Sequence, residues 1–343
     1  MAGPIMTEST EATKGYNEIA VLGAGAWGTA LALAAAEAGR KTLLWARESA
    51  LADSIARDRR NARYLPGVML PQSIRATGDL GEVASAEAIL LAIPAQHIRE
   101  TVAGLAPLLA EGTPLLLCAK GIERGTGLLL TEVLREVAPA AEPAILSGPS
   151  FARDLGKGLP TAVTIAAARI EIARALQASL AHAQFRPYAS DDLTGVALGG
   201  AAKNVYAIGC GIADGLGLGE SARAALLARG FAELIRLGLA MGAKPETLMG
   251  LSGLGDLVLS ATSASSRNYA FGQKLGRGAT LAALEAPGTP LAEGVETAPA
   301  LVARARRHGV ELPVAEAVSQ VLAGALPAPA ALEKLMSRPL KPE

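Results

Sequence analysis

Short, wholly apolar runs alternate with helix-like stretches along the first half of the chain. The runs are YNEIAVL (16–22), KTLLWA (41–46), AILLAIP (88–94), TPLLLCAK (113–120), PAILSGPS (143–150) and TAVTIAA (161–167). Continuous apolar strands of this length are typical of a parallel sheet that is covered on both faces. Helical spacing over 29–39, ending at Gly39, and near 169–181 supplies the connections. The pattern predicts an open, doubly wound α/β sheet.

The strand pattern nearly disappears from about residue 190. Ala, Leu and charged residues then recur at helical spacing, as over 221–242. We therefore expect a doubly wound domain over 16–189 and an all-helical domain over 190–343. Residues 1–15 lack the apolar core of a signal peptide, and we expect them to form a flexible tail.

Composition limits the classes of protein that fit this pattern. The chain has 343 residues, of which 50% are hydrophobic and 19% charged, so it can bury the cores of two domains. Its 32 Lys and Arg balance 32 Asp and Glu, which predicts no general attraction to nucleic acid or to an anionic membrane. Cys118 and Cys210 have no metal-ligand spacing and are typical of buried thiols in a reducing compartment. No uninterrupted apolar run approaches about 18 residues. We expect a cytoplasmic protein without a metal site.

A glycine-rich motif, GAGAWG, follows the first predicted strand and opens the first predicted helix. Its glycines, Gly23, Gly25 and Gly28, have the GxGxxG spacing that lets a turn close and lets backbone approach a pyrophosphate. The following helix start offers free N–H groups to phosphate. An ordinary glycine turn is the alternative, but the order of strand, glycines and helix favours a Rossmann-type dinucleotide site.

The end of the second predicted strand, LLWARES, carries an arginine where NAD-selective sites usually have an acid. Arg47 can stack on adenine and pair with a 2′-phosphate. We therefore expect NADP as well as NAD to be accepted. A solvated surface arginine is the alternative.

Two further stretches follow predicted strands, where open parallel sheets bind their ligands. Lys120, in CAKGIE, is placed to reach a substrate, although a solvated lysine would fit the same pattern. In SGPS, Gly148 permits close approach to a ring, and Ser150 offers a hydroxyl and a backbone donor.

The stretch GGAAKNVYAIGCG (199–211) places Lys203 and Asn204 in otherwise apolar surroundings. Helical glycines cost about 1 kcal/mol each, so Gly199 and Gly200 indicate room for something flat against this helix. A desolvated lysine has a lowered pKa and can donate a proton. Asp256, the single acid in LSGLGDLVLS, is its candidate partner. A lysine that reaches solvent at the edge of a helix contact is the alternative.

Two later motifs add polar groups suited to a substrate and a cofactor. In SSRNYAFG, two serines precede Arg267 and Asn268 at a predicted helix start, a combination that suits a phosphate monoester. In LAEGVET, Glu293 could accept a hydrogen bond from a nicotinamide carboxamide or a ribose, or could cap a helix.

Together these motifs resemble the bacterial-type NAD(P)-dependent glycerol-3-phosphate dehydrogenases. The resemblance runs from about residue 18 to about 325 and includes GAGAWGTALA, AKGIE, SGPSFA, GGAAKNVYAIGCGIADG, GLGDLVLS, SRNYAFG and AEGVET. It implies a Rossmann domain followed by a helical domain, an active site between them and a homodimer. It also implies reduction of dihydroxyacetone phosphate to sn-glycerol 3-phosphate, a phospholipid precursor, with NADP or NAD as cofactor.

The resemblance also implies roles for individual residues. The catalytic positions are Lys203, Asp256, Lys120 and Asn204. The substrate positions are Lys120, Gly148, Ser150, Lys203, Asp256, Ser266, Arg267 and Asn268. The cofactor positions are Gly23, Gly25, Ala26, Trp27, Gly28, Arg47, Lys120, Ala152, Arg267, Leu291 and Glu293. The chain departs from the family pattern at Ala26, where many relatives have serine, at Trp27, where Phe or Tyr is usual, and at Ser260, where threonine is common.

Two other functions fit parts of the sequence. A 3-hydroxyacid or 6-phosphogluconate type of dehydrogenase would bind a carboxylate, whereas the SSRN stretch suits a phosphate better. A non-catalytic NAD(P)-sensing protein would have a vacant catalytic position, whereas Lys203, Asn204 and Asp256 are all present. NADPH oxidation with dihydroxyacetone phosphate, and none with hydroxyacids, would separate the three.

Overall fold

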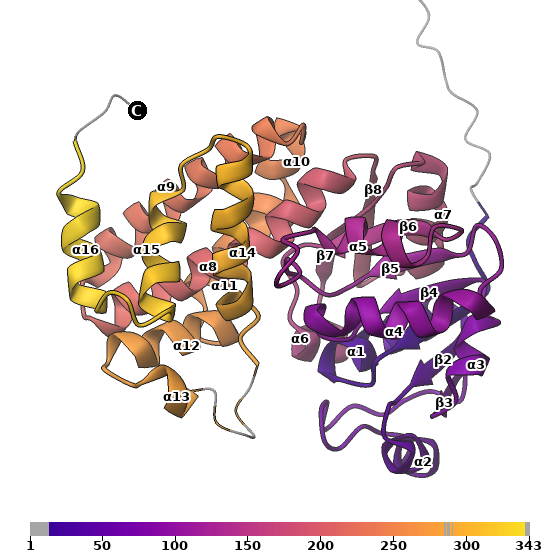
Figure 1. Ribbon diagram of the computed structural model, residues 1–343. Coiled ribbons are helices and arrows are strands. Elements are labelled where there is room, and N and C mark those ends of the chain that lie inside the picture. Colours follow the sequence, from indigo (N-terminus) through magenta and orange to yellow (C-terminus); the bar gives the residue numbers. More distant parts are fainter. Residues whose placement is uncertain (1–13, 285, 287–288, 290, 340–343) are drawn as a thin grey trace, which may run out of the picture.

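A computed structural model describes residues 14–284, 286, 289 and 291–339, so most of the expected N-terminal tail lies outside the described residues. Its first half is an eight-stranded sheet of order β3-β2-β1-β4-β5-β6-β7-β8, on the right of Figure 1. The strands are β1 (Glu18–Leu22), β2 (Lys41–Trp45), β3 (Ile74–Thr77), β4 (Ala88–Leu91), β5 (Pro114–Leu117), β6 (Glu142–Ser147), β7 (Thr161–Ala167) and β8 (Phe185–Ser190). The chain crosses from β3 back past β1 to β4, which confirms the predicted doubly wound sheet.

Helices cover both faces of this sheet, which is why its central strands are apolar throughout. Leu22, Leu91 and Leu117 are completely buried in β1, β4 and β5. The covering elements are α1 (Ala26–Glu37), α2 (Ser49–Asp58), α3 (Leu80–Ala84), η1 (Ala95–His97), α4 (Ile98–Leu105), η2 (Ala106–Leu108), α5 (Leu130–Val137), α6 (Ala152–Gly156) and α7 (Ile170–Leu180). Gly39 has a φ of +82° just after α1 and ends that helix as expected.

The sheet differs from the sequence prediction at its edges and at one pair of strands. The edge strands β3 and β8 have no continuous apolar run: Arg75 is exposed in β3, and β8 contains Pro187 between exposed neighbours. Strand β7 is antiparallel to β6, whereas the other pairs in the sheet are parallel. The connection between them holds only the five-residue α6. A helix that short rises about 7 Å and cannot return along a strand of about 20 Å.

The second half contains helices and no strand in the part of the chain that the structure describes. They are α8 (Leu193–Gly215), α9 (Gly219–Ala240), α10 (Pro245–Met249), the π-helical turn η3 (Leu251–Gly255), α11 (Asp256–Thr262), α12 (Arg267–Gly276), α13 (Leu281–Leu284), α14 (Gly294–Arg307), α15 (Pro313–Leu322) and α16 (Ala328–Met336). Helix α8 is long and apolar enough to cross a membrane by length and composition, but its apolar window is 94% buried inside the protein. It is the core helix of this half, against which α9, α10, α11, α12, α14 and α15 pack (Figure 1).

Glycines bring α12 unusually close to α8. A side chain at Gly211 on α8 would clash with the carbonyl oxygen of Tyr269, and one at Gly272 on α12 with the carbonyl oxygen of Ile208. The same holds one turn further along, at Gly215 and Gly276. The two backbones are therefore in direct contact, and α12 has a fixed position relative to α8.

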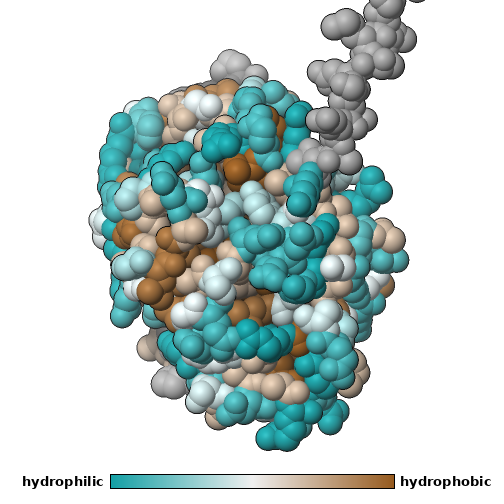
Figure 2. All heavy atoms as spheres, turned by 90° about the vertical axis from the view of Figure 1, so that its right-hand side faces the viewer, coloured by the Kyte–Doolittle hydropathy of each residue, from teal (hydrophilic) through white to brown (hydrophobic). Residues whose placement is uncertain are grey.

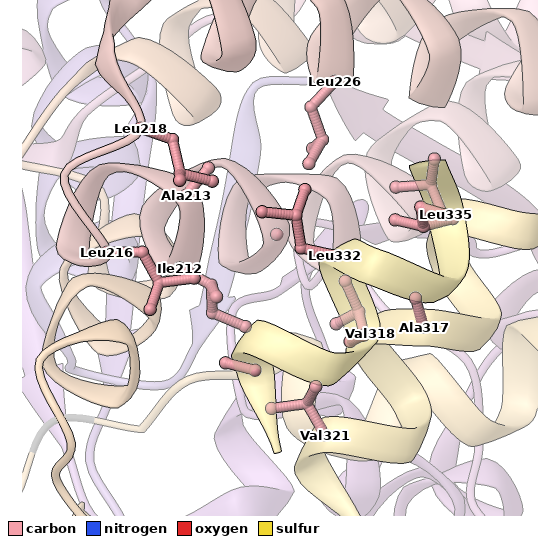
Figure 3. A pocket seen from close by; sticks show the side chains of 14 residues that line it. Ile212, Ala213, Leu216, Leu218, Leu226, Ala317, Val318, Val321, Leu332 and Leu335 are labelled. Carbon is pink, nitrogen blue, oxygen red and sulfur yellow. The ribbon is translucent and has the colours of Figure 1, made fainter. Parts of the chain in front are cut away.

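The helical half has a crevice beside α16 that is lined by apolar residues. Side chains from α8, α9, α15 and α16 line it, including Ile212, Leu226, Val318 and Leu332 (Figure 3). It offers no charged or hydrogen-bonding side chain to a phosphorylated ligand. On the opposite side of the molecule, the face of the sheet half is largely hydrophilic with scattered apolar patches (Figure 2).

Candidate active site

Two lysines and one aspartate meet where the two halves of the chain touch. Lys203 extends from α8, Asp256 begins α11, and Lys120 follows β5. The Lys203 Nζ lies 3.0 Å from one carboxylate oxygen of Asp256, and the Lys120 Nζ lies 2.5 Å from the other. Asp256 is 1% exposed. The predicted pairing of Asp256 with Lys203 is confirmed, and Lys120 is a second cation on the same carboxylate.

Neighbouring oxygens complete the hydrogen bonding of this cluster. Lys203 donates to the Ser260 hydroxyl at 2.7 Å, and Lys120 donates to the Gly148 carbonyl oxygen at 3.0 Å. The hydroxyls of Ser147 and Ser260 lie 3.4 and 3.3 Å from the Asp256 carboxylate. Ser147 was not among the predicted site residues, and Ser260 stood out in the sequence only as a departure from the family pattern. A lone serine at a strand end or in a helix gives no signal of such a contact until the fold is known.

Burial and the charges of its neighbours set the protonation of the cluster. Burial favours the neutral amine and lowers the pKa of Lys203 from 10.5 to about 8, with Lys120 adding to the shift and Asp256 opposing it. Burial acts to raise the pKa of Asp256, but Lys120 and Lys203 outweigh it, so that this pKa is lowered. The arrangement therefore combines an ionised carboxylate with a lysine able to exchange a proton near neutral pH.

The two glycines before Lys203 have a different role from the one expected. A Cβ at Gly199 would lie 2.7 Å from the Ser252 carbonyl oxygen, and one at Gly200 would lie 2.6 Å from the Ser147 hydroxyl. Protein atoms of η3 and β6 thus occupy that side of α8, and the expectation of a flat ligand against it is wrong. The glycines instead let α8 approach the sheet closely enough for Lys203 to reach the cluster.

A chain of side-chain amides links the two halves beside the lysines. The Asn204 amide donates to the Lys120 carbonyl oxygen at 3.3 Å, and Asn268 donates to the Asn204 side chain at 2.8 Å. The side-chain Oδ1 of Asn268 accepts from the Gly294 N–H at 3.0 Å. The side chain of Asn268 therefore forms its hydrogen bonds with other protein groups. The backbone N–H of Asn268 is the group that it can offer to a ligand at the start of α12.

The start of α12 presents a cation and a helix end. Ser266 caps the helix by accepting from the Tyr269 N–H at 3.4 Å, and the next residue, Arg267, is exposed. Glu293, which precedes α14, accepts from the Ala95 N–H at 3.4 Å rather than capping its own helix. Burial raises the pKa of Glu293, although the charge of Arg267 opposes the shift. Leu291 is 48% exposed in the same segment.

The glycine-rich loop has the geometry that a dinucleotide pyrophosphate requires. A Cβ at Gly23 would lie 2.6 Å from the Ala92 carbonyl oxygen, and one at Gly28 would clash with the Gly23 carbonyl oxygen, so both glycines are needed for close packing. Apart from its own chain neighbours, no atom of the described residues lies within 4 Å of the Cβ position at Gly25, which leaves open space beside the loop. The N-terminus of α1 has no side-chain cap. The residues therefore fit a dinucleotide cofactor.

Other expected ligand positions surround this loop. Ala26 and Trp27 form the first turn of α1, Arg47 is exposed beyond β2, and Ala152 begins α6. Gly148 has a φ of +152°, and its Cβ would lie 2.8 Å from the Val163 Cα. Glycine is therefore required at position 148 because β7 lies so close, and not because a ligand ring approaches. The Ser150 hydroxyl donates to the Gly148 carbonyl oxygen at 3.0 Å.

Both cysteines are buried thiols, as expected. Burial raises the pKa of Cys210 to about 12 and that of Cys118 still further. Among the described residues, no three His, Cys, Asp or Glu side chains are grouped so that they could hold a metal ion.

Comparisons with known proteins agree over almost the whole chain. Residues 18–173 match the family model for the N-terminus of NAD-dependent glycerol-3-phosphate dehydrogenase, and residues 192–333 match the model for its C-terminus. The glycerol-3-phosphate dehydrogenase [NAD(P)+] of Parvibaculum lavamentivorans is 55% identical over 331 residues, covering 96% of this chain and 99% of that protein. The enzyme of the same name from a Bradyrhizobium species is 56% identical over 328 residues, with coverage of 96% and 99%.

A solved structure agrees with these matches. The crystal structure of glycerol-3-phosphate dehydrogenase from Coxiella burnetii superposes with a TM-score of 0.89 at 38% identity, covering 94% of this chain and 99% of that one. The fold, the cofactor loop and the sequence relationships lead to the same conclusion, and the resemblance seen in the motifs is confirmed. The chain belongs to the NAD-dependent glycerol-3-phosphate dehydrogenase family.

Proposed function

We propose that this NAD(P)-dependent oxidoreductase reduces dihydroxyacetone phosphate to sn-glycerol 3-phosphate, with Lys203 as the proton donor. The observation that carries the proposal is the buried cluster in which Asp256 holds both Lys203 and Lys120. A carbonyl placed beside it would meet an ammonium group poised to give up a proton. A hydroxyacid dehydrogenase or a protein that only senses NAD(P) is not supported by the family match.

The reaction adds a hydride and a proton across the C2 carbonyl. The reduced nicotinamide supplies the hydride when the cofactor is bound. Lys203, as ammonium, polarises the carbonyl and donates its proton to the forming alkoxide, which gives the secondary alcohol and leaves a neutral amine. Asp256 and Ser260 each accept a hydrogen bond from the Lys203 ammonium and so orient it. The third N–H of the ammonium is the one that can face the substrate carbonyl. Lys120 adds positive charge beside the developing oxyanion.

The phosphate of the substrate is held at the start of α12. Arg267 is exposed there, and the first backbone N–H groups of this ten-residue helix, including that of Asn268, face the same end. Because α12 is packed backbone to backbone on α8, a phosphate bound at Arg267 fixes its carbonyl at a set distance from Lys203.

NADP and NAD are both used. Arg47 is exposed beyond the end of β2, where it can pair with a 2′-phosphate without blocking a free ribose hydroxyl. We further propose a cytoplasmic homodimer that supplies glycerol 3-phosphate to phospholipid synthesis. Light scattering after size-exclusion chromatography tests the dimer: a mass of about 35 kDa, close to the 34.8 kDa of one chain, would contradict it.

The direct test is oxidation of NADPH by the purified protein with a panel of acceptors. Dihydroxyacetone phosphate should support turnover, unphosphorylated dihydroxyacetone should do so far less well, and 3-oxoacids should give none. Turnover with a 3-oxoacid but not with dihydroxyacetone phosphate would contradict the proposed substrate. Binding of NADPH without turnover of any acceptor would contradict the proposed activity.

A further inference from the structure

A buried asparagine far along the chain contacts the glycine-rich loop. Asn61 lies in the segment between α2 and β3 and is 1% exposed. Its Nδ2 donates to the Ala24 carbonyl oxygen at 2.8 Å and to the Thr29 hydroxyl at 2.8 Å. Ala24 stands between the first two glycines of GAGAWG, and Thr29 lies in the first turns of α1. This contact could not be predicted from the sequence, because neither spacing nor residue type connects Asn61 to the loop.

The orientation of this amide is fixed by its own hydrogen bonds. The Asn61 Oδ1 accepts from the Tyr64 N–H at 3.1 Å, while both hydrogens on Nδ2 have acceptors. Rotating the amide by 180° would place its oxygen against the Ala24 carbonyl oxygen, which only accepts, and its nitrogen against the Tyr64 N–H, which only donates. Aspartate has the same size but cannot donate, so it cannot replace the asparagine at this position.

The segment that carries Asn61 is itself held firmly. Arg59 has a φ of +52°, and its guanidinium donates to the carbonyl oxygens of Ile74 at 2.9 Å, Leu70 at 3.2 Å and Pro71. Leu65 is 4% exposed, and its methyl groups lie 3.0 and 3.4 Å from the Cβ position at Gly156 on α6. Asn61 therefore acts on the glycine-rich loop from a rigid base.

The contact determines the direction of a backbone donor. The Ala24 carbonyl and the Gly25 N–H belong to one peptide unit, which is trans and planar, so they point in opposite directions. Asn61 holds the Ala24 carbonyl towards the protein interior, and the Gly25 N–H therefore points away from Asn61. A side chain at Gly25 would enter open space, so this residue of the loop is accessible to a ligand. Within the described part of the chain, that N–H donates to no protein acceptor. A free backbone donor on an accessible residue at the start of a helix suits an anion.

We propose that Asn61 is a positioning residue of the cofactor site, which keeps the Gly25 N–H directed at the cofactor pyrophosphate. Without its donor, the buried Ala24 carbonyl loses the one side-chain partner that it has among the described residues, and this peptide unit can turn to present an oxygen to the pyrophosphate. The inference rests on the use of NAD(P) by this family. It extends that function by assigning control of the pyrophosphate-binding backbone to a residue outside the GxGxxG motif.

The test compares ligands with and without a pyrophosphate on Asn61→Asp, Asn61→Ser and wild type. The dissociation constants of NADPH and NADH, measured by fluorescence titration, should both rise by about 10- to 100-fold, which corresponds to losing one hydrogen bond to an anion. Adenosine 2′-monophosphate carries the adenine and the 2′-phosphate but no phosphate on the 5′-oxygen, so its dissociation constant should stay within about threefold of wild type. The KM for dihydroxyacetone phosphate at saturating cofactor should also be unchanged.

Thr29→Val is the matched control, because it removes the other acceptor of Asn61 and leaves the bond to Ala24. It should change the affinity for NADPH by less than about threefold. Loss of affinity for adenosine 2′-monophosphate equal to that for NADPH, or loss for NADPH and not for NADH, would overturn the proposal. So would unchanged affinity in Asn61→Ser, the smaller and milder substitution, which decides the question if Asn61→Asp does not fold.

Discussion

The pKa and the orientation of a site residue in this protein depend on its burial and on its hydrogen-bond partners. Lys203 illustrates this best, because its low pKa comes from burial, while its orientation comes from Asp256 and Ser260. Lys120 holds the other oxygen of Asp256, so the carboxylate cannot turn away from Lys203. One buried acid thus fixes two cations, and the cluster keeps one excess positive charge to receive an oxyanion.

Replacing Lys203 by alanine should lower kcat by about 10²- to 10⁴-fold, the usual contribution of a positioned proton donor. Wild-type kcat/KM for reduction should fall as pH rises through about 8, because the donating ammonium form exists below the pKa of Lys203 and is lost above it. The variant should lack this decrease, and NADPH should bind it nearly as well as wild type. Retention of more than about a tenth of kcat would show that another group supplies the proton.

Replacing Arg267 by alanine should raise the KM for dihydroxyacetone phosphate and also lower kcat, because binding of the phosphate positions the carbonyl. Losing a guanidinium from a phosphate contact costs about 2–5 kcal/mol. The measurement is the ratio of kcat/KM for dihydroxyacetone phosphate to that for dihydroxyacetone. Arg267→Ala should abolish most of this preference, and Arg267→Lys should restore part of it. An intact preference in the alanine variant would place the phosphate elsewhere.

Replacing Arg47 by glutamate should weaken NADPH binding far more than NADH binding. A carboxylate repels the 2′-phosphate but can still accept from a ribose hydroxyl. Dissociation constants for both cofactors, measured by fluorescence titration, provide the check. Equal losses would mean that Arg47 does not meet the phosphate.

Some site residues could be predicted from the sequence, whereas the contacts of others could not. Lys203, Asp256 and Arg267 could be singled out because a charge in apolar surroundings or behind serines is unusual in itself. Asn268 and Asn61 could not be assigned their contacts, because each acts on backbone that is 26 or 37 residues away. An amide in the sequence does not reveal whether it serves a ligand or a neighbouring turn.

Among the secondary-structure elements, α8 has glycines on several sides, and these let neighbouring elements pack closely against it. Gly199 and Gly200 bring it against η3 and β6, and Gly211 and Gly215 bring it against α12. The apolar central strands and the long helices were predictable, since the strands are continuous apolar runs and the helices repeat apolar residues at helical spacing. The edge strands and the direction of β7 were not, because they depend on exposed residues and on how far a short connection can reach.

Replacing Gly211 by alanine should disturb the substrate site although the residue does not belong to it. The added Cβ would clash with the carbonyl oxygen of Tyr269, so α12 must move away from α8 and carry Arg267 with it. We expect a loss of at least about 1–3 kcal/mol in the free energy of unfolding, typical of overpacking, and a raised KM for dihydroxyacetone phosphate. Urea unfolding and steady-state kinetics measure the two effects.

Gly104→Ala is the control for that variant. Gly104 lies inside α4, and nothing is within 4 Å of its Cβ position. Alanine there should leave the kinetics unchanged and raise the free energy of unfolding by up to about 1 kcal/mol. Equal effects of the two substitutions would mean that close approach of α8 and α12 is not required.

At the scale of the whole molecule, side chains from each half join the two parts of the chain at more than one place. One joint is the pairing of Lys120 with Asp256 at the active site. Another is formed by Arg304 on α14. Its guanidinium donates to both carboxylate oxygens of Glu132 on α5, at 2.7 and 2.8 Å, and to the Gly127 carbonyl oxygen at 2.9 Å. Arg304 is 8% exposed, and the helix that carries it begins beside Glu293.

Replacing Arg304 by methionine should therefore loosen the two halves from each other. It leaves the Glu132 carboxylate and the Gly127 carbonyl without their charged donor, which should cost about 2–3 kcal/mol of stability, because Glu132 remains partly exposed to water. The sheet half should then unfold separately from the helical half, so tryptophan fluorescence, which reports on Trp27 and Trp45 in the sheet half, should no longer coincide with far-ultraviolet circular dichroism during urea unfolding.

Arg306→Met tests whether this joint depends on burial or on charge alone. Arg306 lies two residues further along α14 and pairs with Glu316 at 3.2 Å, but its side chain is 69% exposed. An exposed pair of this kind contributes about 0–1 kcal/mol, so the variant should unfold nearly as wild type does. Adding Glu132→Gln to Arg304→Met should recover part of the lost stability, because the amide removes the unpaired charge and can still accept from the Leu129 N–H. If Arg304→Met were no more destabilising than Arg306→Met, the two halves would be held together by the active-site cluster and by apolar contact, and substitutions at Lys120 or Asp256 should then separate the two unfolding transitions.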